Sequence, residues 1–130
     1  MFIDASAFLA ILLQESEADG LADAIEAAPS RCTSAIAIFE TVAGMMREKG
    51  LPRAVAEDHL RAALATARIE IVPITDEIGR LALDAFDRYG KGRGHPAQLN
   101  MGDCFAYACA KTLRIPLLYK GNDFRQTDLA

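Results

Sequence analysis

The chain has 130 residues, which is enough for a single compact domain, and we expect that domain to span residues 1–130. Slightly over half of the residues are hydrophobic, a quarter are charged and no low-complexity stretch interrupts them, so the composition excludes a disordered chain. The formal net charge of -4 argues against a nucleic-acid-binding protein that depends on a broadly basic surface.

Targeting segments and structural cysteines are not indicated either. No basic segment precedes the first apolar residues, and the early apolar run over residues 7–13 is too short to span a bilayer, so we expect a cytoplasmic protein without a membrane partner. Cys32, Cys104 and Cys109 are odd in number and lack a C-x-x-C spacing. Disulfide bonds and a thiolate zinc site are therefore not expected.

Hydrophobic periodicity and end signals predict both helices and strands along the chain. The expected helices cover residues 6–14, 16–28, 34–49 (capped by Thr33-Ser34), 52–68, 76–89 and 101–114. Short apolar, partly β-branched segments predict strands over residues 2–3, 69–74 and 115–119, followed by a turn-like tail over residues 121–130. Strands that alternate with helices and that are apolar enough to be buried on both faces indicate an α/β sandwich around a mainly parallel sheet.

Asp4 and Asp123 each closely follow a predicted strand. In open parallel sheets, ligands bind beyond the carboxyl ends of the strands, so the two carboxylates could face one crevice. Purely structural roles are equally open, because Asp4 could be the N-cap of the next helix and Asp123 could belong to an Asx-turn.

Glu40 and Asp103 lie on helices whose neighbouring faces are apolar. The residues three and four positions from Glu40 are apolar or small, so its carboxylate is expected to bind metal, to be protonated or to pair with a distant arginine. Asp103 stands in the first turn of its helix, where Asn100 as N-cap would complete a capping box. Capping and metal binding are compatible roles for Asp103.

Four carboxylates without an accompanying set of His or Cys ligands favour an oxygen-preferring ion such as Mg²⁺ or Mn²⁺ over zinc. Such an ion activates water and neutralises charge on a phosphate during in-line displacement. The chemistry that these residues indicate is therefore metal-assisted phosphoryl transfer.

Four segments, taken in order, resemble the PIN-domain nucleases, and in particular the VapC toxins of bacterial VapBC toxin-antitoxin modules. They are FIDASA at residues 2–7, FE at 39–40, LNMGDC at 99–104 and LYKGNDF at 118–124. The resemblance covers nearly the whole chain.

The resemblance implies a PIN-like three-layer sandwich with a central, mainly parallel sheet between helices. It also implies a Mg²⁺- or Mn²⁺-dependent endoribonuclease, the toxin of a type II toxin-antitoxin system. The implied partners are an RNA substrate, a VapB-like antitoxin and a second copy of the chain in a homodimer, with DNA reached only through the antitoxin.

The same resemblance assigns catalytic and metal-binding roles to individual residues. Asp4, Glu40 and Asp103 match the family's acidic site. Asp123 corresponds to a fourth acid, although the family's Asp-x-Asp-Phe pattern is here reduced to Asn122-Asp123-Phe124 after a glycine. Ser6 matches a small hydroxyl residue that would orient the first aspartate.

Other interpretations remain open at this stage. A non-catalytic interaction module could use the acidic pocket to capture an arginine of a partner protein. An aspartyl-phosphate hydrolase is disfavoured because Ser6 stands where that chemistry needs a second aspartate. The segment from Arg88 to His95, with Lys91 and Arg93, could contact an RNA backbone or form a solvated loop.

Overall fold

A sheet of four short parallel strands forms the centre of the molecule, in the order β3-β2-β1-β4. The strands are β1 Phe2–Ile3, β2 Cys32–Ser34, β3 Glu70–Val72 and β4 Leu117–Leu118. The computed structural model describes residues 1–129, so Ala130, the last residue of the predicted tail, lies outside the described residues. β1 is an inner strand, because Phe2 pairs with Cys32 on one side and with Leu117 on the other.

The helices agree with the sequence prediction apart from shifts of a few residues at their ends. Ser34 and Thr75 cap two of them, each with a side-chain oxygen that accepts a backbone N–H, and Gly50 ends one in the left-handed conformation. The elements are α1 Ala5–Leu12, α2 Ala18–Ala27, α3 Ala35–Lys49, α4 Arg53–Thr66, α5 Asp76–Tyr89, α6 Met101–Leu113 and the 3₁₀ helix η1 Asp123–Gln126.

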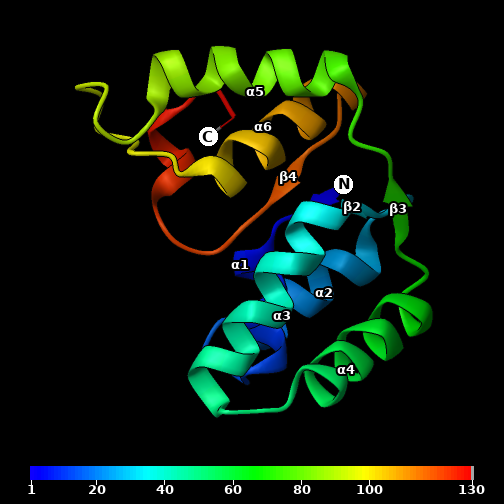
Figure 1. Ribbon diagram of the computed structural model, residues 1–130. Coiled ribbons are helices and arrows are strands. Elements are labelled where there is room, and N and C mark those ends of the chain that lie inside the picture. The colour runs from blue at the N-terminus through cyan, green and yellow to red at the C-terminus, as the bar shows by residue number, and fades with distance from the viewer. Residues whose placement is uncertain (130) are drawn as a thin grey trace.

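The two residues of β1 divide the core into two halves. Phe2 packs in a cluster with α5 and α6, whereas Ile3 packs in a separate cluster with α1, α2, α3 and α4. Side chains alternate between the faces of a sheet, so this division puts helices on both sides of it. Figure 1 shows the resulting layers, with α5 and α6 above the strands and α1 to α4 below them. The predicted three-layer sandwich is confirmed.

Two predictions about the strands were wrong. Thr33-Ser34 was assigned only to a helix cap, but both residues belong to β2, where the hydroxyl of buried Thr33 donates to the Ile3 carbonyl at 2.9 Å. That bond lets a polar segment lie in the middle of the sheet. The expectation that the strands are buried on both faces fails for β3, an edge strand that exposes Glu70 and Ile71. The tail, expected to be turn-like, includes the helical turn η1.

The connections between strands change direction at β1. Helices α1 to α4 carry the chain outward from β1 to β2 and β3, and α5 and α6 return it to β4 on the other side of β1. The carboxyl ends of β1 and β4 therefore flank a topological switch point, where α/β proteins bind ligands. In residues 1–129, no helix combines the length and apolar character needed to cross a membrane.

Candidate active site

Asp4 is a buried helix cap at the carboxyl end of β1. Its carboxylate accepts hydrogen bonds from the backbone N–H of Ser6 at 3.0 Å and from Ser6 Oγ at 2.6 Å, and the residue is only 3% exposed. The backbone N–H of Asp4 donates to the Leu118 carbonyl at 3.0 Å. Asp4 is therefore an N-cap, as one interpretation held, and it also lies at the switch point.

Ser6 connects Asp4 to the segment that follows β4. While Ser6 Oγ donates to Asp4, it accepts the backbone N–H of Lys120 at 2.9 Å. The chain continues from Lys120 to Asp123, the first residue of η1, whose side chain is exposed. A single hydroxyl thus ties the first acid to the loop that carries the last one.

Asp103 occupies the first turn of α6 and completes the predicted capping box. Asn100 Oδ1 accepts the backbone N–H of Asp103 at 2.9 Å, and the Asp103 carboxylate accepts the backbone N–H of Asn100 at 3.1 Å. Asp103 is 8% exposed, so the carboxylate is turned inward as the apolar helix face indicated.

Glu40 projects from α3 towards the beginning of α6. The side chain is half-buried, and its carboxylate lies against Gly102, the residue before Asp103. Among residues 1–129, Glu40 forms no ion pair with a basic side chain, so pairing with a distant arginine was the wrong alternative.

The four acids interact electrostatically. Burial raises the pKa of Asp103 to about 7, and the charges of Asp4, Asp123 and Glu40 add to the rise against a hydrogen bond from Asn100. Burial likewise raises the pKa of Glu40 to about 7, with a contribution from Asp4. Burial also raises the pKa of Asp4, although hydrogen bonds from Ser6 oppose it. The fold therefore brings the four predicted acids close enough for the charges of the other three to act on Asp103. We call these four residues the acidic cluster.

The donor chemistry of this cluster suits a hard divalent cation in an open site. Among residues 1–129, no three His, Cys, Asp or Glu side chains converge into a ready-made metal cage. Mg²⁺ does not need one, because it keeps several water ligands and typically takes one or two carboxylates from a protein. Buried carboxylates that raise each other's pKa are the groups that a bound cation stabilises.

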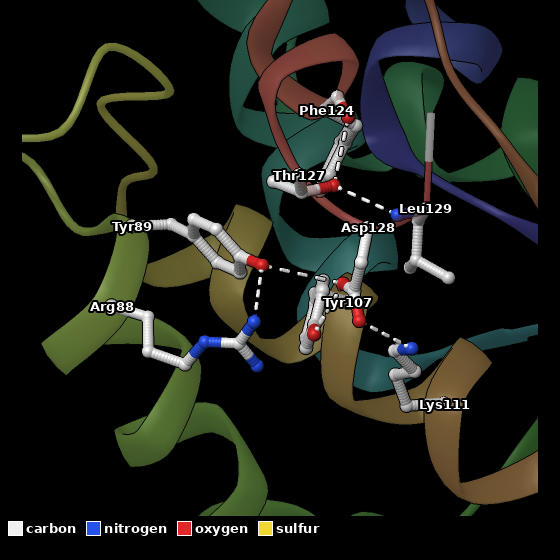
Figure 2. Close-up of polar contacts among 8 residues, drawn as sticks. All are labelled: Arg88, Tyr89, Tyr107, Lys111, Phe124, Thr127, Asp128 and Leu129. Carbon is white, nitrogen blue, oxygen red and sulfur yellow. Dashed lines mark hydrogen bonds and ion pairs between the residues drawn. The ribbon is translucent and has the colours of Figure 1, made fainter.

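The segment after Asp123 is held by side chains from α5 and α6 (Figure 2). Asp128 accepts hydrogen bonds from Tyr107 Oη at 2.6 Å and Lys111 Nζ at 2.7 Å, and a longer one from Tyr89 Oη at 3.5 Å. Arg88 donates to Tyr89 Oη at 2.6 Å and lies over the same ring. We call these five residues the tail clamp; sequence reasoning missed it, although Tyr107 and Lys111 lie one helical turn apart.

The basic segment 88–95 is partly engaged inside the chain. Arg88 belongs to the tail clamp, and Arg93 pairs with Asp87 at 2.8 Å. Lys120, close to the acidic cluster, pairs with Glu15 at 2.5 Å and with Glu17 at 3.6 Å. Contact between the segment 88–95 and RNA stays a prediction.

Comparisons with known proteins identify the family. Residues 1–129 match the PIN domain. A VapC ribonuclease of Rhizobium meliloti is 40% identical over 143 residues, covering 98% of each chain. Ribonuclease VapC28 of Mycobacterium tuberculosis is 41% identical, covering 98% of this chain and 93% of its own. Ribonuclease VapC of Mycolicibacterium smegmatis is 41% identical, covering 100% of this chain and 98% of its own.

Solved structures agree in fold at lower sequence identity. A toxin-antitoxin complex from Klebsiella pneumoniae aligns with a TM-score of 0.70 and 22% identity, covering 98% of this chain and 92% of that chain. The Mycobacterium tuberculosis toxin VapC20, which cleaves the sarcin-ricin loop, aligns with a TM-score of 0.73 and 20% identity, covering 95% of this chain and 92% of its own. The resemblance read from the sequence is confirmed, and the chain belongs to the PIN-domain family and, within it, to the VapC ribonucleases.

Proposed function

We propose that residues 1–130 act as one nuclease domain, a Mg²⁺- or Mn²⁺-dependent endoribonuclease that serves as the toxin of a toxin-antitoxin system. The observation that carries this proposal is the acidic cluster around Asp103, whose four members have no cationic partner among residues 1–129. Identity of about 40% to named VapC ribonucleases over nearly the full chain supports RNA as the substrate.

Each residue of the site is given a role by its surroundings. Asp4 and Asp103, the two most buried acids, would supply oxygen ligands, and Ser6 holds the Asp4 carboxylate in place through its 2.6 Å hydrogen bond. Glu40, whose carboxylate lies against Gly102 next to Asp103, would supply a further oxygen ligand. Asp123 is exposed and would complete the set on the side open to RNA.

When bound, the ion would activate water and neutralise charge on the scissile phosphate. The chain's own contribution is to hold several carboxylates close together at a site that opens to solvent. Part of the net charge of -4 resides in this cluster, so the negative charge that argued against nucleic-acid binding is partly a consequence of the site. RNA can approach the cluster only after a cation has compensated it.

The test is RNA cleavage by the purified protein with Mg²⁺ or Mn²⁺ and with excess EDTA. Asp4→Asn and Asp103→Asn should each lower the rate by about 10²-fold or more while the protein stays folded. Asp58→Asn is the matched control, because Asp58 is exposed on α4 outside the acidic cluster. Undiminished cleavage in EDTA, or by the two variants, would contradict the metal mechanism.

Failure of the unmodified protein to cleave any RNA with either metal would favour the non-catalytic alternative, in which the acidic pocket captures a partner's arginine. Buried carboxylates bind guanidinium well, so that alternative uses the same residues. The assay therefore separates an enzyme from a binding module at a single site.

We further propose that an antitoxin and a second copy of the chain cover exposed apolar surface. Phe39, 74% exposed, and Met46 line an apolar groove beside α3 and α4, and Leu83, Phe86 and Met101 expose apolar surface on α5 and α6. Apolar patches of this kind are typical of protein interfaces. Elution of the purified chain as a monomer in size-exclusion chromatography would contradict the homodimer.

A further inference from the structure

Gly102 lies where any side chain would collide with the carboxylate of Glu40 in its present position. A Cβ atom built on Gly102 would come closer than 3.0 Å to both carboxylate oxygens and to Cδ of Glu40. Real Cβ atoms essentially never make such contacts. The carboxylate of Glu40 thus lies in the space that the side chain of residue 102 would fill.

The helix itself gives no reason for a glycine at this point. Gly102 is not among the residues of the described chain with a positive φ, so its backbone conformation is open to any amino acid. Alanine is the better helix former, and glycine is one of the poorest. The requirement for glycine at position 102 therefore comes from the neighbouring side chain and not from the fold of α6.

Other helical glycines have different surroundings. A Cβ on Gly20 in α2 or on Gly79 in α5 would meet no atom within 4 Å, and a Cβ on Gly44 in α3 would meet the apolar side chain of Leu9. In the described part of the chain, Gly102 is the glycine whose added Cβ would collide with an acidic side chain.

We propose that Gly102 is a positioning residue for Glu40. Because residue 102 has no side chain, the Glu40 carboxylate can occupy the space next to Asp103 that a side chain would fill. This inference rests on the proposed function, because it takes Glu40 to be part of the nuclease site. The colliding atoms are the end of a flexible side chain, so a methyl group at position 102 would turn the carboxylate away without disturbing the backbone. Replacing the glycine should then impair the site and spare the fold.

The experiment compares Gly102→Ala with Gly20→Ala, which makes the same change where the methyl group meets open space. Three properties are measured: thermal unfolding in EDTA, binding of Mn²⁺ and the kinetics of RNA cleavage. For Gly102→Ala we expect an unfolding temperature equal to or above that of the parent, weaker Mn²⁺ binding and cleavage reduced by about tenfold or more. Gly20→Ala should bind Mn²⁺ and cleave as the parent does.

A double variant tests whether Gly102 acts through Glu40. The double variant Glu40→Gln with Gly102→Ala should cleave no more slowly than Glu40→Gln alone. If Gly102 acts only through the Glu40 carboxylate, its replacement has no further effect once that carboxylate is gone. Parent-like Mn²⁺ binding and cleavage by Gly102→Ala, additive losses in the double variant, or a lower unfolding temperature would each overturn the proposal. Parent-like cleavage by Glu40→Gln would instead overturn the role of Glu40 in the proposed function.

Discussion

Helix α6 carries one carboxylate, that of Asp103, and binds another, that of Asp128, and the surroundings of the two are opposite. Asp103, in its first turn, is buried among other acids, and its pKa rises to about 7. Asp128 is held from the same helix by Tyr107 and Lys111; burial raises its pKa, but hydrogen bonds from these two residues outweigh that effect and hold the pKa below its usual range. Asp128, which has a cationic partner, secures the tail, whereas Asp103 has none within residues 1–129 and is the acid that we propose binds a cation.

The difference shows how one small domain divides its acidic residues between stability and chemistry. A paired carboxylate stabilises the folded state, and crowded carboxylates destabilise it until a cation binds. Strain of this kind at a functional site is a common compromise between stability and activity. If the contrast between Asp103 and Asp128 holds, the effect on stability should decrease from Asp128→Asn through Asp103→Asn to Tyr89→Phe.

Asp128→Asn should cause the largest loss of stability. It removes the ion pair with Lys111 and weakens the bond from Tyr107, so we expect the free energy of unfolding at pH 7 to fall by about 1–2 kcal/mol, allowing for the partial exposure of both groups. The pKa of Asp128 is lowered on folding, so its contribution is present above its ordinary pKa and disappears as the pH falls through the folded value. Urea unfolding at pH 7 and pH 3 measures it; equal losses at both pH values would contradict this assignment.

Asp103→Asn should have the opposite effect and raise the free energy of unfolding. Because the pKa of Asp103 is raised on folding, the metal-free folded protein keeps a proton that the unfolded chain releases, and stability declines as the pH rises from about 4 to about 7. In EDTA above pH 7, the variant should be more stable than the parent by about 1 kcal/mol, and the difference should vanish near pH 4. Thermal unfolding across this pH range measures the gain. A variant no more stable than the parent would mean that Asp103 is compensated by a partner.

Tyr89→Phe should have the smallest effect. The variant removes a long bond to Asp128, at 3.5 Å, and the 2.6 Å bond from Arg88, which is exposed and can donate to water instead. We therefore expect the free energy of unfolding at pH 7 to fall by less than about 0.5 kcal/mol, measured in urea. Tyr107→Phe removes the 2.6 Å bond to the same carboxylate and serves as the comparison. Equal losses in the two variants would show that the length of a hydrogen bond in the tail clamp does not predict its contribution to stability.

Most of the fold could be predicted from the sequence because its local signals are strong. Ser34, Thr75 and Asn100 cap their helices as predicted, since a polar side chain before an apolar periodic run has few other uses. β2 escaped prediction because Thr33 looks polar, and its burial depends on the Ile3 carbonyl, which is distant in the sequence. No local pattern carries that information.

The acidic residues of the candidate site could be proposed from the sequence, but the contacts that hold the surrounding segments in place could not. Asp4, Glu40 and Asp103 stood out through their apolar surroundings or the family motif, and in the structure the charges of Asp4 and Glu40 act on Asp103. The space beside Glu40 depends on an inter-helix contact between α3 and α6, and the tail clamp depends on a chain segment that returns to α5 and α6. The space beside Glu40 and the tail clamp both result from tertiary packing, which cannot be predicted from the spacing of residues along the chain.

The position of β1 between β2 and β4 has a consequence for how the protein is made. Of the four strands, β1 leaves the ribosome first, but β4, one of its two partners, follows more than a hundred residues later. The acidic cluster also includes Asp123, which comes after β4. Nascent chains that end before β4 can fold α-helical hairpins but cannot complete the sheet. Under the proposed function, a growing chain should therefore be inert towards RNA until its synthesis has passed residue 123.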